Sequence, residues 1–246
     1  MNWNPTWICP ANDLGDPAAV FGTSFVFEKK ITHANLTITA MGVYEARLNG
    51  RRVGQFVMAP GWTSYHKRLQ YQEYDITDLL TNGKNEIEVT VGKGWYRSPL
   101  PGWLGCAYQD ELRSRPCGLA TQIALTFEDG SSKILSTDES WKVSDGPVRF
   151  SEIYDGEIYD SAKTPLLDQP VTIFDGPTDT LILQQGEEVC EQERLAVKKV
   201  FVTPNGETVL DFGQNMTGYV ELFVNAKAGD CVDLSFAEVM DKEGNF

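Results

Sequence analysis

The sequence predicts an all-β fold, a jelly-roll-like β-sandwich followed by a second, partial β-sandwich. Three observations support this prediction. Apolar and polar residues alternate with a period of two through most regular stretches, as in half-buried strands. The 22 glycines and 12 prolines provide the many turns that an all-β chain needs. Helical periodicity never extends beyond about two turns.

The first module is predicted to span residues 21–165, after a packed N-terminal arm formed by residues 1–20, which lack periodicity. Its hairpin signals are Asn49-Gly50 and Asp129-Gly130, and residues 77–80 form a single helical turn. Its strands are expected at 23–31, 34–41, 43–48, 51–53, 69–76, 85–91, 119–127, 134–135 and from 141 onward.

Two irregular stretches interrupt this pattern. Residues 98–118 form a long loop rich in proline and glycine, and loops of this length inside a compact domain are usually functional or disordered. Residues 163–177 hold three prolines and are predicted to mark the boundary to a second module, 166–246. Its strands are expected at 195–202, 207–212, 218–225 and 230–236.

Net charge and cysteine content limit the partners and the compartment. The net charge of −14 disfavours nucleic acid and anionic membranes as partners. The five cysteines are odd in number and lack CxxC spacing, which predicts buried thiols in a reducing, cytoplasmic compartment, with a Cys106–Cys117 disulfide as the alternative. We find neither an apolar run of roughly 18 residues nor a signal region, although secretion stays open if a signal peptide has been removed.

Several segments resemble one family in their order along the chain, namely Gly42–Gly54, Ala59–Tyr65, Tyr71–Thr77, Gly92–Arg97, Ile153–Asp160, Asp211–Gly218 and Phe236–Val239. The resemblance is to bacterial α-L-rhamnosidases, glycoside hydrolase family seventy-eight, and specifically to their N-terminal β-module and the start of the β-domain that follows it. The piece from Asp75 to Asn85 alone is not specific, because sugar-binding jelly-roll modules of β-galactosidase-like enzymes resemble it too.

The resemblance implies that the full enzyme hydrolyses terminal α-L-rhamnosyl linkages with inversion. It places the catalytic acid and base in a helical barrel downstream of this chain, so the barrel and rhamnose-containing glycans are the expected partners. The chain is then a non-catalytic N-terminal fragment that binds carbohydrate or positions the barrel. A purely structural spacer and a β-galactosidase-like sugar-binding module are the alternatives, and the Asp211–Asn215 segment counts against the second. Calcium stays an open option, since some family members bind rhamnose through it; no other cofactor is expected.

Aromatic residues in loops are the candidate carbohydrate site, because sugars stack their C–H faces on Trp and Tyr rings. Trp103 lies in the long loop and is the expected exposed platform. For Trp62 and Trp95, packing between sandwich and loop is the alternative. The candidates are Trp62, Trp95, Tyr96, Arg97 and Trp103.

No catalytic residue is predicted. Asp155 and Glu157 would lie with Cα atoms about 7 Å apart on one strand, close to the roughly 6.5–9.5 Å carboxyl separation of an inverting glycosidase. Both would face the same side of a ligand, however, so a turn at Asp155-Gly156 and an ion pair of Glu157 with an arginine are expected instead. The two histidines, His33 and His66, are too few for a zinc site and lie near no nucleophile motif.

Overall fold

The structure is a computed structural model that describes residues 3–99, 111–112, 114–227 and 229–245. Its regular structure is almost entirely β-strand, which confirms the predicted all-β class. The exceptions include a 3-10 turn, η1 (Thr77–Leu79), and the one-turn helix α1 (Gly94–Arg97). The chain forms two compact units, residues 1–190 and 191–246, which are described separately.

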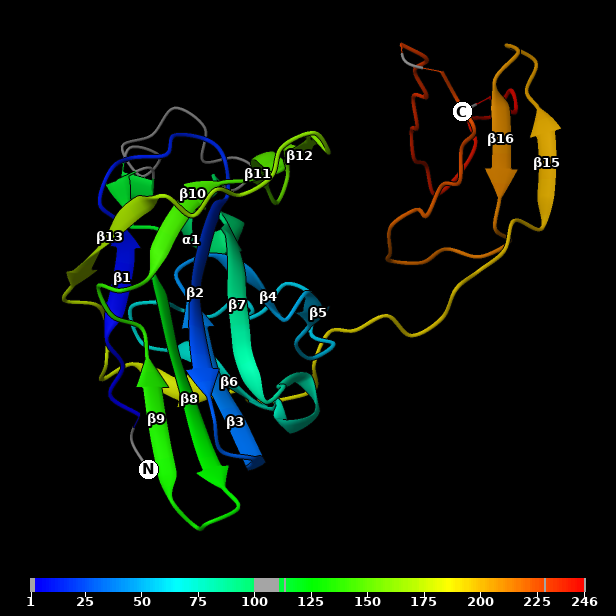
Figure 1. The fold of residues 1–246 in the computed structure, drawn as a ribbon. Coiled ribbons are helices and arrows are strands. Elements are labelled where there is room, and N and C mark those ends of the chain that lie inside the picture. Colours follow the sequence, from blue (N-terminus) through cyan, green and yellow to red (C-terminus); the bar gives the residue numbers. More distant parts are fainter. Residues whose placement is uncertain (1–2, 100–110, 113, 228, 246) are drawn as a thin grey trace. The chain divides into compact units, whose positions relative to one another are not determined.

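The first unit contains two groups of strands that pack face to face (Figure 1). In the first group β3 lies between β6 and β8, β14 is parallel to β6, and β9 and β1 flank β8. The bounds of this group are β1 (Trp7–Pro10), β3 (Ile31–Ala40), β6 (Leu69–Asp75), β8 (Leu119–Phe127), β9 (Ser132–Ser136) and β14 (Leu181–Leu183).

The second group is antiparallel in the order β10-β2-β7-β4-β5. Strand β13 joins the two groups, because it pairs with β1 along residues 171–174 and with β10 at residues 169–170. A separate two-stranded hairpin, β11–β12, completes the unit. The bounds are β2 (Ala19–Phe27), β4 (Val43–Leu48), β5 (Arg51–Arg52), β7 (Gly83–Gly92), β10 (Lys142–Asp145), β11 (Val148–Glu152), β12 (Gly156–Tyr159) and β13 (Gln169–Phe174).

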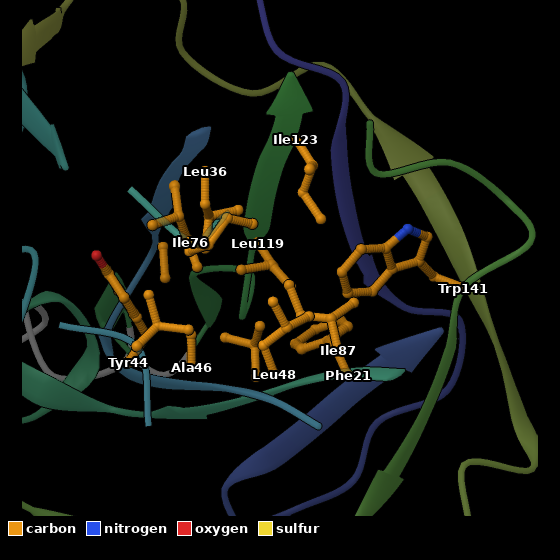
Figure 2. Close-up of a cluster of buried hydrophobic side chains, with 14 of the residues drawn as sticks. Phe21, Leu36, Tyr44, Ala46, Leu48, Ile76, Ile87, Leu119, Ile123 and Trp141 are labelled. Atoms are coloured by element: carbon orange, nitrogen blue, oxygen red, sulfur yellow. The ribbon is translucent and has the colours of Figure 1, made fainter. Parts of the chain in front are cut away.

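The core fills the space between these two groups of strands (Figure 2). Phe21 and Ile87 come from one group, whereas Leu36, Leu119 and Ile123 come from the other, and all five side chains are almost fully buried. The alternation expected for β7 and β3 therefore places every second side chain inside. Burial of apolar surface at about 25 cal/mol per Å² is the main term that stabilises this arrangement.

A buried polar chain connects β4, β6 and the segment after β14. Gln72 on β6 is 1% exposed; its Oε1 accepts a hydrogen bond of 2.7 Å from the Tyr44 hydroxyl, and its Nε2 donates one of 2.8 Å to Gln184 Oε1. Buried polar groups must be paired to avoid a desolvation penalty. This chain of hydrogen bonds therefore helps to hold the segment after β14 against β6 and β4 within the first unit.

The ends of the first unit differ from the predicted limits. Residues 7–10, expected in an irregular arm, form β1, and Trp7 is 2% exposed with its Nε1 donating to Pro177 O at 2.9 Å. The predicted boundary region, 163–177, contains β13, so the division between the compact units falls after Cys190 instead. Prolines marked a break in the sequence, yet Pro170 occupies the second residue of β13, a strand-end position that proline tolerates.

In the described part of the second unit, β15 (Lys199–Val202) pairs with β16 (Thr208–Asp211) in a hairpin. These two strands lie within the predicted strands 195–202 and 207–212. Residues 218–225 and 230–236 do not pair as strands, contrary to the prediction. Phe223 and Phe236 are 86% and 74% exposed. A strand needs a neighbour to satisfy its backbone groups and to cover its apolar face, and alternation alone supplies neither.

Candidate functional site

The candidate site is built around helix α1, directly after the central strand β7. Gly94 begins the helix with φ +52°, and a Cβ atom there would lie 2.8 Å from Val43 N. Glycine is thus required both for the left-handed backbone and for the close approach to Val43, the first residue of β4. This tight packing fixes where the next residues, Trp95 to Arg97, point.

Trp62 and Trp95 form a stacked pair. Their ring centroids are 5.9 Å apart and their planes differ by 6°. Trp62 is 57% exposed, whereas Trp95 is only partly exposed. Trp62 also lines an open concave surface with Thr63 and Ser64. One indole thus supports another whose outer surface is accessible, an arrangement suited to stacking on a sugar ring.

Tyr96 has a packing role. Its ring meets Tyr65 edge to face, with centroids 5.2 Å apart, and the Arg115 guanidinium lies 5.1 Å from its centroid. Arg115 Nη1 also donates a 3.0 Å hydrogen bond to the Tyr96 carbonyl. Burial raises the pKa of the Tyr96 hydroxyl. These contacts tie α1 to the loops beside it.

A small polar pocket of about 210 Å³ lies beside α1. Lys93 Nζ donates to Asp16 Oδ1 at 3.0 Å and to Glu152 Oε1 at 2.8 Å, and it lies 4.8 Å from the centroid of Phe150. Arg97 lines the same pocket. The lining residues are Asp13, Gly15, Asp16, Lys93, Arg97, Pro99, Leu112 and Glu152.

The other predicted positions lie apart from this pocket. Trp103 lies outside the described residues. Asp155 and Glu157 are exposed at the β11–β12 hairpin; its turn spans residues 153–155, so Asp155 ends the turn and Gly156 begins β12. Within the described residues, the ion pair in this region involves Glu152, and none was found for Glu157. His33 Nδ1 lies 3.9 Å from Asp75 Oδ2 on the surface.

Metal ligands and thiols do not gather in the part of the chain that the structure describes. No group of three or more His, Cys, Asp or Glu residues is placed to hold a metal ion there. Among the described cysteines, Cys9, Cys117 and Cys231 are free thiols, and Cys106 lies outside the described residues. Among the described helices none has the length and apolarity needed to cross a membrane.

Sequence reasoning missed the cluster of Asp16, Lys93 and Glu152. Lys93 stood inside a recognised segment, but its two partners are 77 and 59 residues away. Nothing in local periodicity indicates such a pairing. The only available signal was a lysine between two glycines directly after a buried strand.

Comparison with known proteins identifies the family. The family model described as the α-L-rhamnosidase N-terminal domain matches residues 29–193. The chain belongs to the α-L-rhamnosidase family. A second model, the bacterial α-L-rhamnosidase concanavalin-like domain, matches residues 201–246. The first match lies almost entirely within the first compact unit, and the second lies within the second unit.

Individual α-L-rhamnosidases agree in sequence and fold. The chain is 37% identical over 227 residues to an α-L-rhamnosidase of Streptomyces avermitilis, covering 88% of this chain and 22% of that protein. It is 33% identical over 234 residues to one of Formosa agariphila, covering 90% and 25%. The chain therefore spans about a quarter of the length of the curated relatives it matches.

Solved rhamnosidase structures resemble the chain as well. The Aspergillus terreus enzyme gives a TM-score of 0.78 at 37% identity, covering 87% of this chain and 26% of that one. The Streptomyces avermitilis enzyme complexed with L-rhamnose gives 0.71 at 34% identity, covering 81% and 20%.

Proposed function

We propose that this chain is the N-terminal, non-catalytic part of a longer α-L-rhamnosidase and serves it as an accessory carbohydrate-binding module. The ligand is a rhamnose-containing glycan, and the longer protein, including a downstream catalytic barrel, hydrolyses terminal α-L-rhamnosyl linkages. The observation that carries the proposal is the exposed Trp62 indole, held against Trp95 with their planes 6° apart.

A supported indole is a suitable sugar platform for a physical reason. Trp95 restricts the Trp62 side chain before any ligand arrives, so less conformational freedom is lost on binding. L-rhamnose has a C6 methyl group that glucose lacks, and this methyl contributes about 1 kcal/mol when it covers an apolar face. A single ring on a single indole offers limited contact, so the expected affinity is on the order of millimolar, or about −4 kcal/mol.

The test is an NMR titration of the 246-residue chain with L-rhamnose, following the indole N–H signals. The Trp62 signal and that of the stacked Trp95 are expected to shift in a saturable way, and Trp62→Ala is expected to abolish the shift of the Trp95 signal. Tyr154→Ala is the matched control, since Tyr154 is an exposed aromatic residue on the separate β11–β12 hairpin, at 54% exposure. Titrations with calcium and with a chelator show whether the ion contributes.

Two results would contradict the proposal. If rhamnose at tens of millimolar shifts no indole signal, with or without calcium, the chain acts as a structural spacer that only positions the rest of the enzyme. If Tyr154→Ala weakens binding as much as Trp62→Ala, the indole pair is not the platform.

A further inference from the structure

We infer that Arg115 is a positioning residue for the stacked indoles of Trp62 and Trp95, and that it acts on them through the rings of Tyr96 and Tyr65. Arg115 lies 19 residues after Tyr96 in the chain, and its side chain is only 11% exposed. This role rests on the proposed function in one respect, namely that the indole pair binds a sugar. It adds a residue that controls the sugar platform from within the fold.

Arg115 holds the C-terminal end of helix α1. The helix ends at Arg97, so the carbonyl of Tyr96 belongs to the last turn, whose carbonyls have no partner within the helix. Arg115 Nη1 donates to this carbonyl at 3.0 Å, and the guanidinium lies 5.1 Å from the centroid of the Tyr96 ring. A one-turn helix is not stable on its own, so such contacts decide its orientation. Because Trp95 directly precedes Tyr96, they also set where Trp95 points.

The guanidinium is held in turn by a carboxylate. Arg115 Nη2 donates to Glu111 Oε1 at 2.9 Å, while Nη1 serves the Tyr96 carbonyl. An exposed ion pair of this kind contributes little to stability. Its effect here is on direction, because the planar guanidinium presents its donors at fixed angles. With one side of the fork on Glu111, the other side and the flat face are aimed at Tyr96.

Tyr65 extends this arrangement to the loop that carries Trp62. Its ring meets Tyr96 edge to face, with centroids 5.2 Å apart, a favoured geometry for aromatic pairs. The loop is closed on itself, since Thr63 Oγ1 donates to Arg68 O. The position of Tyr65 therefore determines that of Trp62. Both tyrosine rings also pack against a buried cluster of Trp7, Met41, Leu69 and Ala120.

The indole stack depends on this second layer because its two members come from different segments. Trp62 belongs to the loop before β6, and Trp95 belongs to α1. Their planes differ by only 6°, which requires a fixed placement of the loop against the helix. The contact of Tyr65 with Tyr96 supplies that placement. An indole that is ordered before the ligand arrives loses less freedom on binding, so the sugar affinity is expected to depend on Arg115.

The test compares Arg115→Gln with Arg149→Gln in the 246-residue chain. Arg149 is the matched control, because it makes the same kinds of contact elsewhere. It pairs with a carboxylate four residues away, Asp145, and Nη1 donates to the backbone carbonyl of Gly146 at 2.9 Å. Urea midpoints of both variants show whether their overall stability is comparable.

The first readout needs no ligand. Arg115→Gln is expected to shift the indole N–H signals of Trp62 and Trp95 and to reduce their near-ultraviolet circular dichroism, whereas Arg149→Gln should leave both unchanged. In titrations with L-rhamnose, Arg115→Gln is expected to bind about threefold to tenfold more weakly than the wild type, the loss typical of one cation–π contact and one hydrogen bond from a charged group.

A second pair of variants tests whether the ring of Tyr96 transmits the effect. Tyr96→Leu keeps the backbone carbonyl but removes the ring, and it is expected to reproduce the indole shifts of Arg115→Gln. Tyr96→Phe restores the ring and should restore the wild-type indole signals.

The positioning role is overturned if the ligand-free indole signals of Arg115→Gln match those of Arg149→Gln, or if Tyr96→Leu behaves like Tyr96→Phe. It is also overturned if Arg115→Gln binds L-rhamnose as tightly as a wild type that responds to the sugar. A wild type that shows no response to L-rhamnose contradicts the proposed function instead, and the ligand-free signals then still decide whether Arg115 positions the indoles.

Discussion

Replacing Gly94 with alanine tests how tightly α1 is seated on the strands beneath it. The backbone at this position has φ +52°, a left-handed conformation that costs an alanine about 1–2 kcal/mol. The new Cβ would also lie 2.7 Å from Val43 Cγ1 and 2.8 Å from Val43 N. Backbone cannot move aside as a side chain can, and such overpacking costs about 1–3 kcal/mol. Gly94→Ala is therefore expected to lower the free energy of unfolding by about 2–5 kcal/mol.

Gly130→Ala separates the two contributions. Gly130 has φ +79°, but nothing lies within 4 Å of the position its Cβ would take. This variant should therefore show the conformational cost alone, about 1–2 kcal/mol. The comparison of both variants with the wild type isolates the effect of the close approach to Val43.

The assay is urea unfolding, combined with near-ultraviolet circular dichroism of the stacked Trp62 and Trp95. Gly94→Ala should shift the midpoint more than Gly130→Ala and should alter the tryptophan signal, because α1 carries Trp95. Equal destabilisation by the two variants, with an unchanged tryptophan signal, would refute the reasoning that the close contact with Val43 positions the indole pair.

Three further predictions concern single groups. Gln72→Leu should lower the free energy of unfolding by about 1–3 kcal/mol, because it removes the Gln72 acceptor of the buried Tyr44 hydroxyl on β4. Limited proteolysis should then cut at residues 181–185, and resistance equal to that of the wild type would contradict this prediction. Hydrogen bonds, chiefly from Lys29, hold the pKa of Asp129 well below its usual range. The resulting stabilisation is present above the unfolded-state pKa of about 4 and is lost as pH falls below it. The thermal stability of Asp129→Asn should therefore depend less on pH between about 5 and 3 than that of the wild type. Parallel pH profiles would disprove the stabilising role of the Asp129 carboxylate. Burial raises the pKa of the Cys117 thiol to about 11, so peptide-mapped alkylation at pH 8 should label the exposed Cys231 first; faster labelling of Cys117 would show that this thiol is not enclosed.

Local pattern was sufficient for several strands of the first unit, such as β4 and β7. The alternation of Ile87, Val89 and Val91 predicted one buried face of β7, and all three side chains are buried. The turn signal Asn49-Gly50 likewise predicted the link between β4 and β5. These features follow from sequence because side-chain direction in a strand and the conformational preferences of turn residues depend on neighbours along the chain.

Pairing between distant segments was beyond the sequence. Periodicity showed that residues 218–225 alternate, but a strand forms only where another chain segment offers its backbone, and no segment among the described residues pairs with them as a strand. The same limit hid β1, which is short and irregular in sequence yet is held in place by β13, more than 150 residues away.

For the candidate site, the sequence determined which residues are aromatic or charged, and the tertiary structure decided which of them meet. Composition and loop position selected Trp62, Trp95 and Arg97. Only the fold stacked the first two and set Arg97 beside Lys93 in a common pocket. The physical reason is that exposure and hydrogen-bond partnership depend on contacts across the fold, such as that of Lys93 with Glu152, which no local preference encodes.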